Sequence, residues 1–235
     1  MWQRVALSRG VYYYLFVLGL VASGCAGRPG PIVPEQLPEL PHSEARAWVD
    51  GYVPEHPVLY NLRWRHETQK GGASGRATVR FVPPDSIRFD YRGPFGRSGA
   101  AVLVGDSVLW SEPQEDAEGF VGVAPLFWAA LGLPRVAAAT AVVSGRRDGR
   151  VQLWRYSSAS DTLTYRAVAG EHATLDAELR RNGNRVGLAE VTFADSTGLA
   201  DHALMRFPQD ATVFTFTVRT IEPLTSVDPG IWRQP

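Results

Sequence analysis

Few residues of this 235-residue chain have the types and spacing of a reactive centre. The five histidines stand at positions 42, 56, 66, 172 and 202, and no two are four residues apart, as paired metal ligands on one helix face would be. Ser107 follows Gly105 and Asp106 but lacks the second glycine of a nucleophile elbow. We therefore expect no metal, no cofactor and no enzymatic activity. A catalytic triad whose serine, histidine and acid are brought together only by the fold stays an open alternative at this point.

Cys25 is the one residue whose surroundings predict a covalent modification. It is the single cysteine, so it has no disulfide partner within the chain. Arg4 and Arg9 form a positive start, an apolar run over residues 11–21 follows, and small residues stand at 22–24. This is the order of a secretory signal, and the apolar run is much shorter than the roughly 20 residues of a membrane span. Residues 1–24 are thus predicted to be a signal peptide.

The segment that ends at Cys25 resembles the lipobox of bacterial lipoproteins, with Val21 and Ala22 where leucine is usual. The resemblance implies a thioether-linked diacylglycerol on Cys25 and a membrane partner for the mature chain. Two or three acyl chains hold a protein firmly, whereas one gives marginal binding. Ala26, in place of an aspartate, implies the outer membrane facing the periplasm.

The rest of the composition limits the partners and divides the chain. After removal of residues 1–24, 22 basic residues face 24 acidic ones, so we expect no nucleic-acid partner. Residues 26–41 contain five prolines and show no periodicity. Proline fixes φ and removes backbone donors, so residues 25–41 are predicted to be a lipidated, extended tether. Residues 42–235 would then form the folded domain.

Two short helices and many strands are predicted within this domain. Residues 40–52 suit a helix with Ser43 as N-cap and Gly51 at its end, and residues 124–133 suit an apolar helix that starts near Pro125. From residue 58 apolar and polar residues alternate, which is typical of antiparallel strands with one buried face. The pattern predicts a mainly β fold of about 10–11 strands with a few short helices, in which an antiparallel meander closes into a barrel or a sandwich.

The turn Gly93-Pro94-Phe95-Gly96 joins two of these strands and places an aromatic residue where loop tips are usually polar. Two interpretations of Phe95 are open. Its ring can fold back onto the rim of the sheet, or it can stand out as an apolar finger that touches lipid or a hydrophobic groove of another protein.

Residues 43–222 resemble the LolA/LolB family, the periplasmic carrier and outer-membrane receptor of lipoproteins. The likeness is greatest over residues 87–104, where the receptor has a strand, an Asn-Pro-Leu-Gly turn and another strand. Pro94 and Gly96 agree with that turn, Gly93 replaces its asparagine, and Phe95 matches its functional leucine. The resemblance implies an α+β, mainly β fold: an incomplete antiparallel β-barrel of about 10–11 strands around a hydrophobic cavity, with a few short helices as a lid. It also implies a lipid- or membrane-contact loop at Pro94 and Phe95.

The function implied is a membrane-anchored envelope lipoprotein that binds acyl chains and helps to receive or insert lipoproteins or lipids at the outer membrane. A periplasmic LolA-like carrier is a candidate partner. The alternative is a structural or assembly lipoprotein that uses the same fold to bind a protein, with a filled interior; an envelope hydrolase would need a polar cluster inside the pocket. The cavity-lining candidates are Leu62, Trp64, Val79, Phe81, Ile87, Phe89, Phe127 and Trp128.

Overall fold

The computed structural model describes residues 36–114, 122–136, 140–195 and 197–233. The predicted signal peptide, Cys25 and most of the predicted tether lie outside them. Every described element belongs to the compact unit Pro31–Pro235, which therefore holds a hydrophobic core of its own. Among the described residues no helix is long and apolar enough to cross a membrane.

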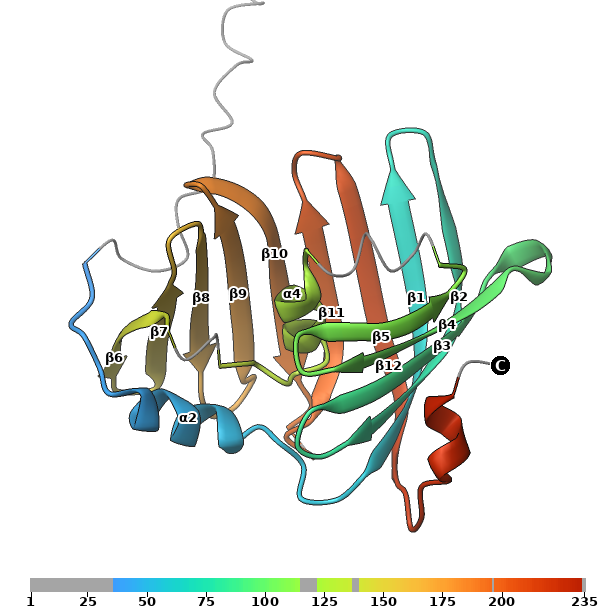
Figure 1. Cartoon of the computed structure of the whole chain (residues 1–235), viewed down its shortest axis with the longest axis horizontal. Coiled ribbons are helices and arrows are strands. Elements are labelled where there is room, and N and C mark those ends of the chain that lie inside the picture. The colour runs from blue at the N-terminus through green and yellow to red at the C-terminus, as the bar shows by residue number, and fades with distance from the viewer. Residues whose placement is uncertain (1–35, 115–121, 137–139, 196, 234–235) are drawn as a thin grey trace, which may run out of the picture. The chain divides into compact units, whose positions relative to one another are not determined.

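Twelve strands make up most of this unit (Figure 1). In chain order the elements are α2 His42–Asp50, β1 Val58–Thr68, β2 Gly71–Val82, β3 Ser86–Arg92, the 3-10 turn η1 Pro94–Gly96, β4 Ser98–Val104, β5 Ser107–Glu112, α4 Ala124–Ala130, β6 Val142–Asp148, β7 Val151–Ser157, β8 Asp161–Val168, β9 Thr174–Arg181, β10 Asn184–Phe193, β11 Ala200–Phe207, β12 Thr212–Pro223 and η2 Pro229–Trp232.

The strands form one antiparallel sheet in the order β5-β4-β3-β2-β1-β12-β11-β10-β9-β8-β7-β6. Consecutive strands pair with each other from β1 to β5 and from β6 to β12, whereas β5 and β6, which are separated by the segment with α4, do not pair. Strand β12 returns to pair with β1, from Val58 opposite Pro223 to Glu67 opposite Val213, which joins the two halves of the sheet. Strands β5 and β6 stand at the two ends, so the barrel is not closed. The predicted fold class is confirmed.

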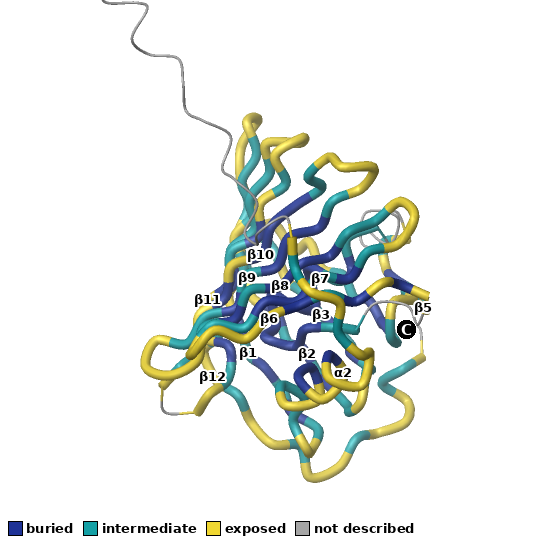
Figure 2. The backbone as a smooth tube through the Cα atoms, turned by 90° about the vertical axis from the view of Figure 1, so that its left-hand side faces the viewer, coloured by how far each residue is buried: buried dark blue, intermediate teal, exposed yellow. Residues whose placement is uncertain are grey.

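Alternation of side chains explains which face of the sheet is buried. Tyr60 and Leu62 of β1, like Val79 and Phe81 of β2, are almost fully buried, whereas the residues between them face the other side. Figure 2 shows the same change between buried and exposed residues along the strands. One face of the sheet thus carries the core, and the opposite face is wet.

Helix α2 covers one end of this core. Ala45, Trp48 and Val49 are buried as the periodicity predicts, and the Trp48 ring stacks on Trp154 of β7 with centroids 4.3 Å apart. The prediction of Ser43 as N-cap is wrong: Pro41 holds that position, without a side-chain cap, and Ser43 lies inside the first turn. The backbone N–H of Glu44 is instead bonded to the Pro41 carbonyl.

The twelfth strand, β6, is absent from the prediction of 10–11 strands. It ends in the charged residues Arg146, Arg147 and Asp148, which conceal its short alternating start. On its free side β6 is paired with the end of the predicted tether. The Leu40 N–H donates to the Val143 carbonyl at 3.0 Å, and the Gly145 N–H donates to the Pro38 carbonyl at 2.9 Å.

Candidate functional site

The inner face of the sheet is filled by helix α4. Its seven residues, Ala-Pro-Leu-Phe-Trp-Ala-Ala, include no polar side chain except the indole N–H, and all but Pro125 are buried. The Phe127 ring meets Phe89 and Phe216 edge-on, with centroids 5.4 and 6.1 Å away. Trp128 meets Phe81 in the same way at 6.3 Å. Helix α4 therefore lies between the two halves of the sheet as an apolar plug.

Two polar contacts hold the plug in place. The Trp128 Nε1–H donates to the Gly105 carbonyl at 2.9 Å, in the turn between β4 and β5. The Arg135 guanidinium lies 4.9 Å from the centroid of the Trp128 ring, so a cation–π contact adds to this bond. The other side-chain contacts described between α4 and the sheet are apolar packing, which is not directional.

Small residues on β9, β10 and β11 make room for α4. Ala177, Gly187, Ala189 and Ala203 are buried at inner positions of these three strands, next to the helix. A Cβ atom on Gly187 would lie 2.8 Å from Leu126 Cδ1, closer than a real contact allows. The sheet is therefore hollowed under α4, and the helix occupies the hollow part. We call these four residues the small-residue floor.

A hollow of about 760 Å³ begins where α4 ends. Leu131, Gly132 and Leu133, which follow the helix directly, form one wall. The other walls come from the segment after α2, the start of β1, and the turns after β8 and β10. Its volume lies in the range of small-molecule sites, which are about 300–1,000 Å³. The apolar lining includes Tyr52, Val53, Tyr60, Val168, Phe193 and Leu199.

Two tyrosines line this hollow and stay uncharged at neutral pH. Burial raises the pKa of Tyr60 to about 12. Burial also raises the pKa of Tyr52, against a smaller opposite effect of the adjacent Trp48 indole. Charged groups lie at the rim, where Asp195 and Glu171 flank His172. The chemistry of the hollow is thus that of an apolar binding site with a polar edge.

Phe95 stands at the tip of the β3–β4 hairpin, away from the core. Its side chain is 101% exposed, so the interpretation in which the ring folds back onto the sheet rim does not hold. Its backbone has φ +58°, a left-handed conformation that is rare for a bulky residue. The turn is closed by the Gly93 N–H, which donates to the Arg97 carbonyl at 2.7 Å. Exposed strain of this kind concentrates at functional sites.

The residues predicted to line a cavity are brought together, but as a packed core. Leu62, Val79, Phe81, Ile87, Phe89, Phe127 and Trp128 are at most 8% exposed. Trp64 is half-buried near the hairpin tip, where its indole Nε1–H donates to the Arg76 carbonyl at 3.3 Å. With α4 in place, the strand residues of this set pack against each other and against the α4 side chains Phe127 and Trp128. Their role as lining of an open cavity remains a prediction that depends on α4 moving.

Sequence reasoning missed the small-residue floor and the hollow beside α4. The floor has a signal, because alanine and glycine recur at inward positions of three strands where larger residues are usual. The hollow has none, because segments distant in sequence, from residue 51 to residue 200, form it. Among the described residues no three His, Cys, Asp or Glu side chains are grouped to hold a metal ion.

No family model and no curated protein matches this sequence. Among solved structures, a LolA superfamily protein from Nitrosomonas europaea is 10% identical, with 83% of this chain and 98% of that chain aligned at a TM-score of 0.56. A putative outer membrane lipoprotein-sorting protein domain from Vibrio parahaemolyticus is 8% identical, over 81% of this chain and 94% of that one, at 0.48. A DUF1329 family protein from Desulfovibrio piger is 6% identical, over 82% and 95%, at 0.34.

The likeness to the Nitrosomonas protein spans almost all of that structure and most of this chain. The structural comparison thereby agrees with the resemblance found in residues 43–222. The chain therefore has the same fold as this LolA superfamily protein.

Proposed function

We propose that this chain is an envelope lipoprotein, anchored through Cys25, that shelters acyl chains in its apolar interior. It would receive lipoproteins or lipids, from a LolA-like carrier in the periplasm, and help to insert them into the outer membrane. Support comes from the fold, from the sequence before Cys25, from the hollow beside α4 and from the exposed Phe95. No covalent step on the cargo is required.

The observation that carries the proposal is the wholly apolar plug on a small-residue floor. If α4 moves outward, the floor formed by Ala177, Gly187, Ala189 and Ala203 faces a space as wide as a helix. An acyl chain that enters this space from water gains about 25 cal/mol per Å² of apolar surface buried. Exchange of α4 for hydrocarbon replaces one apolar contact with another, so the cargo is held weakly enough to be released. In this proposal an acyl chain binds first in the hollow beside Leu131.

Phe95 would make the contact with lipid. An exposed aromatic side chain on a narrow hairpin can enter the outer part of a bilayer without exposing the core. Its strained backbone keeps the ring pointing away from the sheet instead of packing onto it. In this proposal Pro94 and Phe95 mark the place where cargo passes to the membrane.

Uptake of a fluorescent fatty acid by the unit 31–235 tests the proposal. We expect saturable binding with a rise in fluorescence, because hydrocarbon leaves water for the interior. Phe95→Glu serves as the matched variant: it should bind the fatty acid like the wild type and lose delivery of a lipoprotein to vesicles. Absence of any uptake, or delivery unchanged by Phe95→Glu, contradicts the proposal.

The anchor is tested separately. We expect Cys25→Ser in the full chain to abolish labelling by radioactive palmitate and to release the protein from the membrane fraction. Labelling that persists in this variant would show that Cys25 is not the acylated residue.

One observation favours the second candidate, a structural lipoprotein that binds a protein partner without carrying lipid. Phe127 and Trp128 are at most 1% exposed, so the interior is filled in this conformation. A filled interior that never opens suits a scaffold. The fatty-acid experiment decides between the two, because a scaffold shows no saturable uptake.

A further inference from the structure

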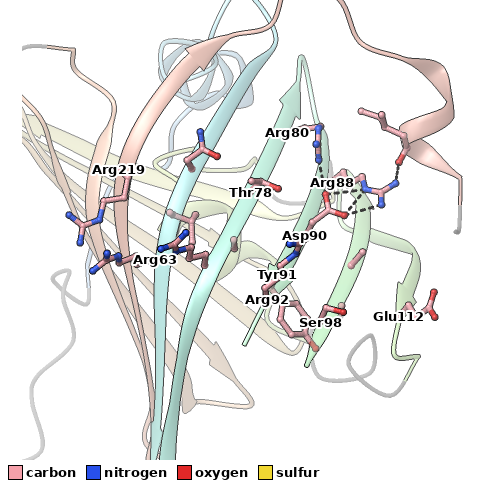
Figure 3. Close-up of a pocket in the computed structure, with 17 residues that line it drawn as sticks. Arg63, Thr78, Arg80, Arg88, Asp90, Tyr91, Arg92, Ser98, Glu112 and Arg219 are labelled. Atoms are coloured by element: carbon pink, nitrogen blue, oxygen red, sulfur yellow. Dashed lines mark hydrogen bonds and ion pairs between the residues drawn. The ribbon is translucent and has the colours of Figure 1, made fainter. Parts of the chain in front are cut away.

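Four arginines lie side by side on the outer face of the sheet, opposite the core. Arg63 of β1 pairs directly with Arg76 of β2, and Arg76 pairs directly with Arg92 of β3. Arg219 lies in a β-bulge of β12, next to Val218, which pairs with Leu62 of β1. All four side chains are exposed. We call these residues the arginine row. All four line one hollow, in which Figure 3 labels Arg63, Arg92 and Arg219.

No acidic residue of the described chain forms an ion pair with any member of the row. Like charges directly opposite on neighbouring strands destabilise a sheet. In the other half of the sheet Arg180 and Arg185 also stand directly opposite each other, but both form ion pairs with the buried Glu178, Arg185 at 3.2 Å. There, opposed or nearby acids meet the arginines in the pairs Arg166–Asp176 at 3.1 Å, Arg181–Asp161 at 3.1 Å and Arg206–Glu190 at 2.6 Å. The row therefore lacks a neutralising group that the same sheet supplies elsewhere.

The hollow in front of the row has a volume of about 1180 Å³ and is bordered by two more arginines. The carboxylate of Asp90 forms ion pairs with both Arg80 and Arg88, at 2.7 and 2.9 Å. Arg88 also donates to the Ile231 carbonyl of η2, so the C-terminal segment closes one side. Asp90 is engaged by these two arginines, and Glu112 is the one other acid among the lining residues. Six arginines thus face two carboxylates, and the hollow favours an anion.

The position of the row indicates which anion. Arg92 comes directly before the turn that carries Phe95, and Arg97 directly follows it. A fully exposed apolar ring flanked by cations is the combination that binds an anionic membrane surface. Guanidinium groups match phosphate oxygens with paired hydrogen bonds. We propose that the arginine row binds the phosphate groups of anionic phospholipids while Phe95 enters the bilayer. This inference rests on the membrane contact proposed for Phe95.

Flotation with lipid vesicles tests the proposal. The unit 31–235 is mixed with vesicles of phosphatidylcholine alone or with phosphatidylglycerol added. We expect binding to increase at least about tenfold with phosphatidylglycerol and to weaken as salt is added. The variant Arg63→Gln/Arg76→Gln/Arg92→Gln should lose this increase. Its thermal unfolding temperature should not fall, because three opposed like charges are removed, so the loss cannot be attributed to misfolding.

A variant with the same change of charge elsewhere is the control. Arg46→Gln/Arg146→Gln/Arg147→Gln alters three exposed arginines of α2 and β6 and should bind the anionic vesicles within about twofold of the wild type. Equal binding by the row variant and the wild type overturns the proposal. So does binding of inorganic phosphate by a protein that shows no preference for anionic vesicles.

Fatty-acid uptake separates this inference from the proposed function. The row variant should take up the fluorescent fatty acid like the wild type, because the row and the plug lie on opposite faces of the sheet. Vesicle binding without uptake would leave the row standing and refute acyl-chain carriage. Uptake without a preference for anionic vesicles would support acyl-chain carriage and refute the role of the arginine row.

Discussion

At the scale of single residues, Phe95 combines two costs that a purely structural turn would avoid. Its ring contributes no packing, since it is 101% exposed, and its φ of +58° is left-handed. A left-handed conformation costs a residue with a side chain roughly 1–2 kcal/mol. Gly96, which follows with φ +76°, shows that glycine is used where the turn needs it. A phenylalanine kept at such a position is best explained by a contact outside the domain.

We expect Phe95→Gly to raise the free energy of unfolding by about 1 kcal/mol, because glycine adopts this conformation without strain and no packing is lost. The same variant should bind anionic vesicles less well than the wild type. Chemical denaturation and vesicle flotation measure the two effects.

Leu109→Ser is the control for Phe95→Gly. Leu109 is another large apolar residue at the surface, 59% exposed, but it lies in β5. This variant should leave vesicle binding unchanged. A loss of stability in Phe95→Gly, or equal loss of vesicle binding in both variants, would contradict the assignment of Phe95.

Tyr60 gives a prediction about pH. Its pKa is raised by burial to about 12, against about 10 in an unfolded chain. The folded state holds the proton more tightly, so the stabilisation is complete below pH 10 and is lost as pH rises through 12. Two pKa units correspond to about 3 kcal/mol. The chain has one lysine, Lys70, so lysine deprotonation contributes little to this range.

Tyr60→Phe should therefore flatten the decrease of stability between pH 10 and 12 by about 2 kcal/mol, measured by urea denaturation at each pH. Burial also raises the pKa values of Tyr156 and Tyr165, so a smaller decrease remains in the variant. An identical profile for variant and wild type would show that the Tyr60 hydroxyl is not buried.

At the scale of elements, α4 and the small-residue floor form a matched pair. The bulky side chains come from a seven-residue helix, and the strands below it carry alanine and glycine. A fixed core would be as stable with larger residues on the strands and no helix. The arrangement suits a sheet whose inner space is filled by a separable part of the chain.

A reversible cross-link between α4 and β10 tests whether the plug must move. A side chain at position 187 would point at Leu126, and the unit 31–235 has no cysteine of its own. We expect Leu126→Cys/Gly187→Cys to take up fatty acid when reduced and to lose at least about tenfold of its affinity when oxidised, because the disulfide holds α4 on the sheet. Reduction should restore uptake. The wild type treated with the same oxidant is the control, and full uptake by the oxidised protein would refute the movement of α4.

The elements also show how far the sequence alone reaches. Period-two alternation predicts strands such as β1, β2 and β3, and continuous apolar residues between prolines predict α4, because both signals depend on local burial. Strand β6 escapes prediction, since its second half is charged. The N-cap at Ser43 fails because Pro41 already starts the helix.

Long-range pairing explains what the sequence conceals at the site. The packing of α4 on β9–β11 and the opposition of Arg63, Arg76 and Arg92 depend on strand register. Each arginine, seen alone, is one of many polar residues on the wet face of a strand. Their row becomes visible when the strands are aligned.

At the scale of the whole domain, the sheet presents different features at its two halves. The hairpin with Phe95 and the arginine row belong to β1–β4 and the adjoining β12, whereas the end of the predicted tether is attached to β6, at the far edge. An unpaired edge strand invites pairing with another chain. Residues 38–40 cover part of this edge, and the Leu40 side chain reaches over Gly145. The tether thus also protects the sheet.

We expect Leu40→Pro in the unit 31–235 to expose the β6 edge, because proline cannot donate the bond that the Leu40 N–H gives to the Val143 carbonyl at 3.0 Å. The freed edge should pair with that of a second copy, and light scattering after size exclusion should show dimers or larger species at concentrations where the wild type is monomeric. Glu39→Pro is the matched control. Glu39 lies opposite Ser144, and its N–H makes none of the bonds that join the segment to β6, so this variant should stay monomeric. If Leu40→Pro is equally monomeric, the bond to β6 does not protect the edge, and residues 38–40 act as tether alone.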